Sequence, residues 1–287
     1  MNRYEYNKVS KMLDELQLQI NNIRALIEVY EEIEVDSGDE QGKDAAVEFL
    51  KKILSDGDVQ LPKEYSYSCL PLCLIDAIYS IGVRYASTKN VVEHYCERYK
   101  VEPFCDKVEM DKFDKLHTLS NLIAEIEEYK KGKKDFEGFA KEILKNEQRT
   151  SSRNGVLKIV AVYKCAKVLK DEGIDTIRDF NEKMNDDKVA DEIKKKFCEV
   201  KGQTSGISLD YLRMLCGRTD VIKPDRHILR FLNRFSKEDV SVDNASAMME
   251  EIWKELIKDY PNLDLRTLDY IIWEYMKNGV SDFNTTY

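Results

Sequence analysis

Glycine and proline are scarce in this chain, and their scarcity limits the fold. Only 12 glycines and 5 prolines occur in 287 residues, whereas many-stranded sheets need frequent turns built from these two residues. Apolar residues recur at spacings of three and four almost throughout, which is the period of an amphipathic helix. The sequence therefore predicts an all-α protein, large enough for one domain or two lobes.

Long hydrophobic runs and a disulfide pattern are also missing. No apolar run approaches the roughly 20 residues of a membrane span, and the start, MNRYEYNKVSKML, has no signal-peptide apolar block. Seven cysteines, an odd number scattered from Cys69 to Cys216, are typical of small core residues and not of a disulfide framework. We expect a cytoplasmic protein without membrane contact. With only three histidines available, we also expect no metal site.

Charge is distributed unevenly around a net value of −9. Residues 1–60 contain 14 acidic and 7 basic side chains, whereas residues 194–234 contain 10 lysines or arginines and 4 acidic side chains. A local basic band attracts a polyanion even when the net charge is negative. The same band is equally typical of a solvated helix face, so charge alone leaves both interpretations open.

The apolar pattern also predicts boundaries along the chain. An acidic loop is expected over residues 34–44 and one continuous helix over residues 111–129. Ser87 or Thr88 is the expected N-cap of a helix, and Gly173 the expected end of another. We divide the chain into N-terminal helices over residues 1–60, a helical core over 61–222 and C-terminal helices over 223–287.

The stretch KGQTSGISLDYLRMLCGRTDVIKPDRHILRF, residues 201–231, concentrates glycine and proline. Two glycines that can adopt positive φ predict a tight turn within a helix-hairpin-helix over about residues 194–216. Backbone amides of such a turn, beside a helix N-terminus, suit a DNA phosphate without sequence recognition. An ordinary helix connector is the alternative. The predicted phosphate contacts are Gly202, Gln203, Thr204, Ser205, Gly206, Ile207 and Ser208.

Asp225 stands at the head of an arginine-rich helix, directly after Pro224. An aspartate in this place is a typical N-cap, whose side chain accepts hydrogen bonds from the first free amides. It is equally a carboxylate held in one rotamer, as catalysis would need. The two roles are compatible.

The order of these motifs resembles the helix-hairpin-helix/GPD superfamily of base-excision DNA glycosylases. The similarity comprises VKGQTSGISLDYLRMLCG, VIKPDRHILRF and the upstream RTSSRNGVLKIVAVYKCAKVL and LPLCLIDAIYSIGVRYASTKNVVEHY, over roughly residues 65–235. It implies a two-lobed fold in which an N-terminal helical extension packs with the C-terminal helices. It also implies hydrolysis of the N-glycosidic bond of a damaged or modified base flipped out of double-stranded DNA. Asp225 would stabilise the oxocarbenium-like state and position water.

Two departures from the family pattern refine this expectation. The hairpin glycines are four residues apart instead of two, which predicts a longer turn with altered phosphate contacts. Residues 203–208 contain no lysine, the nucleophile of relatives that also cleave the backbone, so the resemblance implies a monofunctional enzyme. No cysteine follows Asp225, so no iron–sulfur cluster is expected. No cofactor is required, and a monovalent cation at the hairpin stays open.

Two more groups are candidates for DNA contact. In the base pocket, Tyr79 and Tyr85 would stack on the flipped base, with plain core packing as the alternative. Asp76 lies in the apolar run CLIDAIY, where an acid is costly to bury without a partner. It either recognises a polar base edge or forms a structural bridge with Arg84 or Lys158, and we favour the bridge. Phosphate contacts are expected from the polar loop residues Arg149, Thr150, Ser151 and Arg153.

Other functions stay open at this level. A protein of the same fold could bind DNA or a protein without chemistry, and the acidic helices over residues 1–60 could serve assembly. We expect a monomer, with dimerisation through these helices as the alternative. Alkylated purines are the first substrate candidates because their glycosidic bonds are already weakened. No residue separates a role in repair from one in defence against modified viral DNA.

Overall fold

The computed structural model describes residues 39–55, 61–62, 65–105, 109–132 and 135–278. Within these ranges the chain is helical and contains no strand, apart from two isolated antiparallel bridges, Tyr67–Phe104 and Arg149–Leu157. The predicted all-α class is therefore confirmed. The chain divides into a central unit, residues 62–223, and a terminal unit that takes in residues up to Leu61 and from Pro224 onward.

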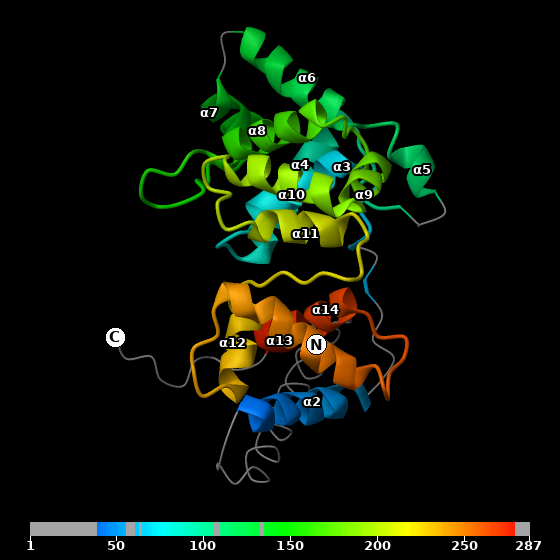
Figure 1. Cartoon of the computed structure of the whole chain (residues 1–287). Coiled ribbons are helices and arrows are strands. Elements are labelled where there is room, and N and C mark those ends of the chain that lie inside the picture. Colours follow the sequence, from blue (N-terminus) through cyan, green and yellow to red (C-terminus); the bar gives the residue numbers. More distant parts are fainter. Residues whose placement is uncertain (1–38, 56–60, 63–64, 106–108, 133–134, 279–287) are drawn as a thin grey trace, which may run out of the picture. The chain divides into compact units, whose positions relative to one another are not determined.

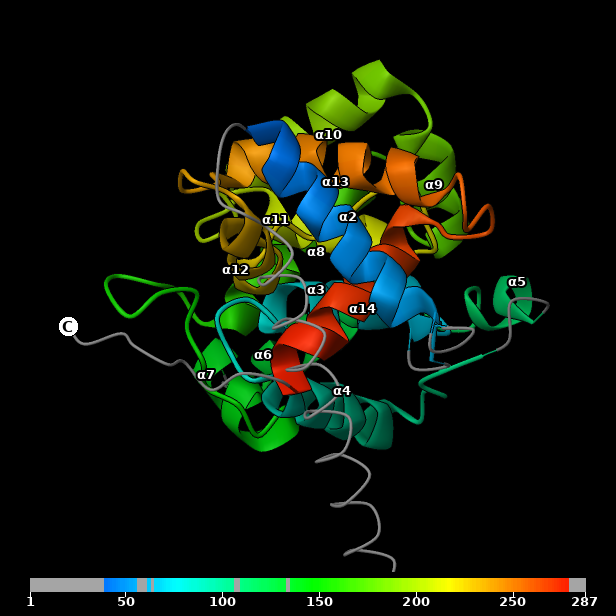
Figure 2. The same cartoon turned by 90° about the horizontal axis from the view of Figure 1, so that it is seen from below.

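The terminal unit is assembled from segments near both ends of the chain. It contains α2 (Asp39–Ser55), α12 (Arg226–Phe235), α13 (Val242–Leu256) and α14 (Leu265–Asn278). Within this unit α2 packs beside α13 and α12, and α14 packs on α12 (Figures 1 and 2).

Phe49 of α2 is fully buried in the terminal unit. Its ring centroid lies 6.1 Å from that of Phe231, 5.6 Å from that of Phe235 and 5.0 Å from that of Tyr275. Aromatic rings at such separations add attraction beyond the area that they bury. The apolar face of α2 is thus buried against helices that lie far away in the sequence.

The acidic segment over residues 34–44 was predicted as a loop, and for its second half this is wrong because α2 begins at Asp39. Residues 34–38 lie outside the described residues. Gly42 lies within this part of α2, where a Cβ atom would lie 1.9 Å from the carbonyl oxygen of Phe235. The close approach of two helices therefore outweighs the poor helix propensity of glycine.

The central unit is built around α3 (Leu70–Tyr79), all ten residues of which are buried. It packs against α4 (Tyr85–Tyr99), α6 (Leu119–Lys131), α8 (Lys158–Asp171) and α11 (Ile207–Leu215), as Figures 1 and 2 show. A helix that is apolar on all sides requires neighbours on all sides. Two further helices of the unit, α9 (Ile177–Met184) and α10 (Asp187–Cys198), pack on each other, and α10 also packs on α8.

Two predicted helix boundaries have opposite outcomes. Gly173, with φ of +78°, follows the end of α8 at Asp171 and Glu172, as predicted. The predicted N-cap at Ser87 or Thr88 is wrong, because α4 already begins at Tyr85. The Ser87 hydroxyl oxygen instead accepts hydrogen bonds from the side-chain amides of Asn146 and Gln148, both at 3.1 Å.

The helix predicted over residues 111–129 is interrupted. It is divided into α5 (Met110–Phe113) and α6, whose N-cap Thr118 forms a capping box with Asn121. Between them the buried Asp114 carboxylate accepts hydrogen bonds from the amides of Ile177 at 2.9 Å and Arg178 at 3.1 Å. The carboxylate therefore satisfies free amides at the start of α9, which a continuous helix would prevent.

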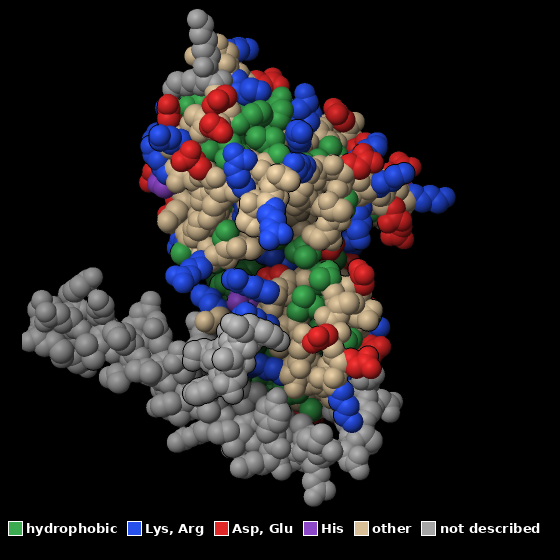
Figure 3. All heavy atoms as spheres, turned by 90° about the vertical axis from the view of Figure 1, so that its left-hand side faces the viewer, with side chains coloured by type: hydrophobic (Ala, Val, Ile, Leu, Met, Phe, Trp, Pro, Cys, Tyr) green, Lys and Arg blue, Asp and Glu red, His purple; other side chains and the backbone are tan. Residues whose placement is uncertain are grey.

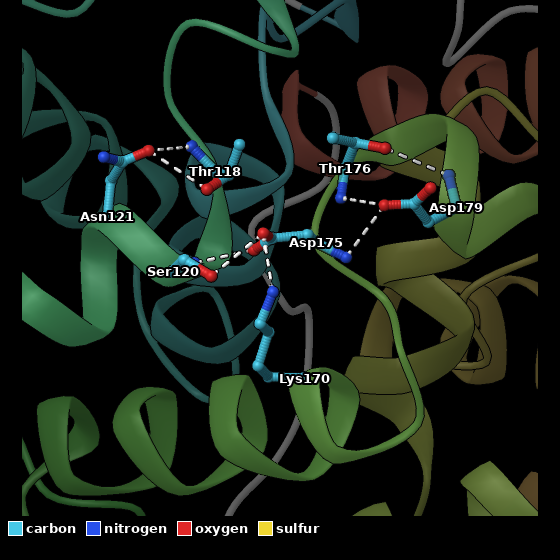
Figure 4. A network of polar contacts seen from close by, with 7 residues as sticks. All are labelled: Thr118, Ser120, Asn121, Lys170, Asp175, Thr176 and Asp179. Atoms are coloured by element: carbon cyan, nitrogen blue, oxygen red, sulfur yellow. Dashed lines mark hydrogen bonds and ion pairs between the residues drawn. The ribbon is translucent and has the colours of Figure 1, made fainter.

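A polar network joins the starts of α6 and α9 to the end of α8 (Figure 4). Asp175 accepts hydrogen bonds from the Ser120 amide at 2.7 Å and the Lys170 ammonium at 2.7 Å. The Asp179 carboxylate in turn accepts hydrogen bonds from the amides of Asp175 and Thr176, both at 3.0 Å. Backbone amides at the starts of α6 and α9 thus donate hydrogen bonds to side-chain carboxylates.

A short helical segment, α7 (Phe136–Gly138), continues as a π-helical turn over Phe139–Ile143. The turn is followed by Leu144, its C-cap, and by Lys145, which has φ of +52°. Six of the seven cysteines are buried, and Cys198 is half-buried. The predicted core role of most cysteines is therefore confirmed.

Candidate functional site

The hairpin consists of α10, a turn over residues 199–206 and α11. Gly202 has φ of +91° and Gly206 has φ of +74°, so both glycines adopt the positive φ that the sequence predicted. The turn is closed by hydrogen bonds from the Gln203 amide to the Val200 carbonyl, 2.9 Å, and from the Gly206 amide to the Gln203 carbonyl, 3.0 Å. Gly206 is the N-cap of α11 and has no side chain to cover the free amides there.

The polar side chains of the turn separate into two groups. Gln203 and Ser208 are buried, and the Ser208 hydroxyl donates to the Gln203 side-chain oxygen. Thr204 and Ser205 are exposed. Between the two glycines, the side chains exposed to solvent are therefore the hydroxyls of Thr204 and Ser205, and Gln203 and Ser208 stabilise the turn from inside.

The loop over residues 149–157 lies against this turn. A Cβ atom on Gly202 would lie 2.3 Å from the Cβ of Thr150 and 2.5 Å from its hydroxyl oxygen. The loop is held in shape by a hydrogen bond of 2.9 Å from the Thr150 amide to the Val156 carbonyl. The structure therefore brings together two groups of predicted DNA contacts that lie about fifty residues apart in the sequence.

The two arginines of this loop differ in freedom. Arg149 donates to the Gly155 carbonyl at 2.9 Å and lies 3.8 Å from the Glu137 carboxylate. Arg153 is exposed. The backbone carbonyl of Arg153 accepts a 2.7 Å hydrogen bond from the Ser151 hydroxyl. Both arginines are thus exposed, but the Arg149 guanidinium has partners within the protein, the Gly155 carbonyl and the Glu137 carboxylate.

The hairpin turn and the loop lie on the left of the central unit in Figure 1, and this side faces the viewer in Figure 3. Lysine and arginine side chains recur over the central unit in this view (Figure 3). Aspartate and glutamate side chains lie mainly toward its upper and outer edges. Such a distribution favours a polyanion locally despite the negative net charge.

Asp225 caps α12 in the terminal unit. Its Oδ1 accepts a 2.8 Å hydrogen bond from the His227 amide, and its carbonyl accepts a 3.0 Å hydrogen bond from the Leu229 amide. The side chain is half-buried. Two exposed arginines, Arg226 and Arg230, follow on α12, which has no acidic residue in its first turn. The carboxylate is consequently held in one orientation at the head of a basic helix.

Asp76 has tyrosine hydroxyls as partners instead of the predicted basic residues. Its Oδ2 accepts hydrogen bonds from the hydroxyls of Tyr67 at 2.7 Å and Tyr85 at 3.2 Å. The side chain is 0% exposed, and Oδ1 has no hydrogen-bond partner. Burial raises the pKa of this carboxyl from 3.8 to about 6, against the opposing effects of the Tyr67 hydroxyl, Lys223 and Tyr85.

Lys158 was one of the two predicted partners of Asp76. Its ammonium donates instead to the carbonyls of Tyr79 and Ile81, both at 2.8 Å, at the end of α3. Burial, together with repulsion from Lys223, lowers its pKa to about 8. Tyr79 is fully buried and belongs to the core around α3. Asp76 and Tyr85 therefore come together, whereas Tyr79 has the surroundings of a packing residue.

Lys223 and Tyr211 were not singled out from the sequence. The Lys223 ammonium lies 3.7 Å from the centroid of the Tyr211 ring and donates a 3.0 Å hydrogen bond to the Ser80 hydroxyl. A lysine between Ile222 and Pro224 was the available signal. Ser80 lies 143 positions away in the sequence, so spacing alone does not identify it as a partner.

The described residues contain neither a cluster suited to a metal ion nor a helix suited to a membrane. No group of three or more histidine, cysteine, aspartate or glutamate side chains is placed there to hold a metal ion. Each helix in the described part of the chain is too short or too polar to cross a membrane.

Comparison with known proteins identifies the family. No curated protein and no solved structure matches the chain. The profile of one family, described as Domain of unknown function (DUF8548), matches residues 44–277. The match includes the hairpin, the loop over residues 149–157, Asp76 and Asp225. Because it spans most of the sequence, the chain belongs to the DUF8548 family.

Proposed function

We propose that this protein is a monofunctional DNA glycosylase that hydrolyses the N-glycosidic bond of a damaged or modified base. The observation that carries the proposal is the contact between Gly202 and Thr150, which joins the two predicted backbone-binding segments. Hydrolysis of a bond in DNA held there also requires a catalytic group. Asp225, at the head of α12, supplies it.

The hairpin and the loop would bind the DNA backbone. Gly202 and Gly206 have positive φ, which allows the tight turn between α10 and α11. Gly206, the N-cap of α11, has no side chain that could cap the first backbone amides of this helix. Amides at a helix N-terminus and short hydroxyls bind phosphate oxygens without reading bases. Thr204, Ser205 and Arg153 are the exposed side chains that would add to this grip.

Asp225 would carry the chemistry. Departure of the base leaves positive charge on the deoxyribose, and a nearby carboxylate stabilises this charge more strongly in a site shielded from water. The hydrogen bond from the His227 amide holds Oδ1, so the carboxylate does not have to be oriented during the reaction. The carboxylate would also position the attacking water on the sugar.

The nucleophile in this proposal is water. The hairpin has no lysine over residues 203–208, and Lys201, before the first glycine, is exposed. An amine nucleophile would leave a covalent adduct with the sugar, whereas water releases the base and leaves an abasic site. The base would enter its pocket by flipping out of the duplex, with Asp76 and Tyr85 as pocket residues. Neither a metal nor an organic cofactor takes part in this scheme.

The test is base release by wild type and by Asp225→Asn. Purified protein is incubated with duplex oligonucleotides that each contain one lesion or modified base, and alkali then reveals abasic sites. Wild type should release at least one base. Asn caps helices as well as Asp, so Asp225→Asn should stay folded and lose release by about 100-fold or more.

A matched control is Asp243→Asn, which neutralises another carboxylate in the first turn of a helix in the same unit. It should keep the wild-type rate. Equal rates in Asp225→Asn and wild type would remove Asp225 from the mechanism. No release by wild type from any substrate, together with salt-sensitive DNA binding, would instead favour a non-catalytic DNA-binding protein.

A further inference from the structure

Lys223 is a buried lysine at the end of the central unit. It is 8% exposed, and its ammonium lies 3.7 Å from the centroid of the Tyr211 ring. The ammonium also donates a 3.0 Å hydrogen bond to the hydroxyl of Ser80, the C-cap residue of α3. One side chain thus connects the second hairpin helix, α11, with the end of the central helix α3.

The surroundings explain why a charged lysine is stable here. An ammonium over the face of a tyrosine ring is attracted by the π electrons, and more strongly where water is excluded. The fully buried Asp76 carboxyl attracts Lys223, whereas Lys158 repels it. The hydroxyls of Tyr67 and Tyr85 hold Asp76 in turn. Lys223 is therefore fixed by an aromatic ring, a hydroxyl and a carboxyl group.

The connection from Lys223 to Asp225 along the chain is short. Only Pro224 lies between them, so their Cα atoms are at most about 7 Å apart along the chain. Proline fixes its own φ and restricts the residue before it to extended conformations. Asp225 itself is fixed on its other side by the hydrogen bond from the His227 amide. Few backbone rotations separate the Lys223 side chain from the carboxylate.

The geometry points to Lys223 as a positioning residue that links the hairpin to the catalytic carboxylate. This inference rests on the proposed role of Asp225. Binding of a phosphate by the hairpin would orient α11, α11 would hold Lys223 through Tyr211, and Lys223 would set the start of the segment that carries Asp225. The lysine does not touch the substrate. Its loss should impair the chemical step more than DNA binding.

The variants are Lys223→Met, Lys223→Arg and Lys188→Met. Methionine keeps much of the length and apolar character of lysine but removes the charge and the hydrogen bond. Arginine keeps the charge and its attraction to an aromatic ring. Lys188→Met removes the same charge from an exposed position on α10 and controls for weaker electrostatic attraction of DNA.

Two measurements are compared on these variants. Single-turnover base release at saturating protein should fall by about 10- to 100-fold in Lys223→Met, as expected for a small displacement of a catalytic group. Its DNA affinity should equal that of Lys188→Met, and Lys223→Arg should recover most of the rate. Hydrogen exchange of the amides over residues 226–229 should be faster in Lys223→Met than in wild type or Lys188→Met. This second measurement needs no substrate.

The outcomes separate this inference from the proposed function. A wild type that releases no base contradicts the glycosylase, and amide exchange at the start of α12 still tests the positioning role. Unchanged exchange there in Lys223→Met overturns the inference, as does a release rate equal to that of Lys188→Met. If Lys223→Met does not fold, Ser80→Ala removes only the hydroxyl acceptor and should give smaller effects in the same directions. Tyr211→Met removes the aromatic ring beside the Lys223 ammonium. Full function of Tyr211→Met, together with no effect of Ser80→Ala, would also overturn the inference.

Discussion

Gly202 and Thr150 are in such close contact that no side chain fits between them. A Cβ atom on Gly202 would lie 2.3 Å from the Thr150 Cβ, far inside normal van der Waals separation. Gly202 also has φ of +91°, a conformation that is unfavourable for other residues. Glycine is therefore required at position 202 for two reasons: the positive φ of the turn and the close packing against Thr150.

We expect Gly202→Ala to destabilise the central unit and to weaken DNA binding. Gly217→Ala is the matched control, because Gly217 has φ of +98° but nothing within 4 Å of the added Cβ. Gly217→Ala should cost about 1–2 kcal/mol of unfolding free energy. Gly202→Ala should cost about 1–3 kcal/mol more, because atoms must also move apart. Urea denaturation measures both, and equal losses would contradict the close packing.

The two loop arginines should have different effects on DNA affinity. Arg153 is exposed, so Arg153→Ala should weaken DNA binding and reduce the slope of log affinity against log salt by about one. Arg149 is held by the Gly155 carbonyl and Glu137, so Arg149→Ala should mainly lower stability. Binding titrations at several salt concentrations, with melting temperatures, distinguish the two. An unchanged salt slope in Arg153→Ala would remove it from the phosphate contacts.

Asp76 should make stability depend on pH in a defined direction. Burial raises its pKa from 3.8 to about 6 in the folded protein, so the folded state binds the proton more tightly than the unfolded state. This contribution to stability is complete below about pH 4 and is lost as the pH rises through about 6, by about 3 kcal/mol in total.

The measurement is the unfolding free energy of wild type and Asp76→Asn from pH 4 to pH 8. Asparagine does not titrate, so the variant should gain stability relative to wild type as the pH rises. Subtracting the two curves removes the contributions of all other groups. Parallel curves would show that Asp76 does not titrate in this range.

Phe49 should be essential for the terminal unit. It is fully buried against aromatic rings of α12 and α14, so Phe49→Ala should cost about 3–5 kcal/mol. Phe180→Ala, at a fully buried position of the central unit, is the matched control. Amide exchange should accelerate over α12–α14 in the first variant and over α8–α10 in the second. Unaffected exchange in α12 of Phe49→Ala would contradict the packing of α2.

Local signals in the sequence predicted most of the helices and the turn. The period of apolar residues locates α8, α10, α11, α13 and α14, and glycine chemistry gives the positive φ of Gly202 and Gly206. These features depend on residues a few positions apart. The interruption before α6 depends on Asp114 reaching the amides of α9, a tertiary contact that local periodicity does not contain.

The contacts of the candidate site were harder to predict from the sequence for the same reason. The costly burial of Asp76 was recognised, but its partners, Tyr67 and Tyr85, each lie nine residues away and on either side of it. Lys223 meets Ser80 across 143 positions of the chain. Residue type indicates that a buried charge needs a partner, and only the packed helices determine which partner it finds.

The division of the chain has a consequence for its synthesis. The central unit is one continuous stretch, so it can fold as soon as it has left the ribosome. By contrast, α2 emerges early and has to wait for α12 and α13 before its apolar face is covered. The aromatic rings that cover Phe49 belong to α12 and α14, so its burial has to follow the translation of these helices.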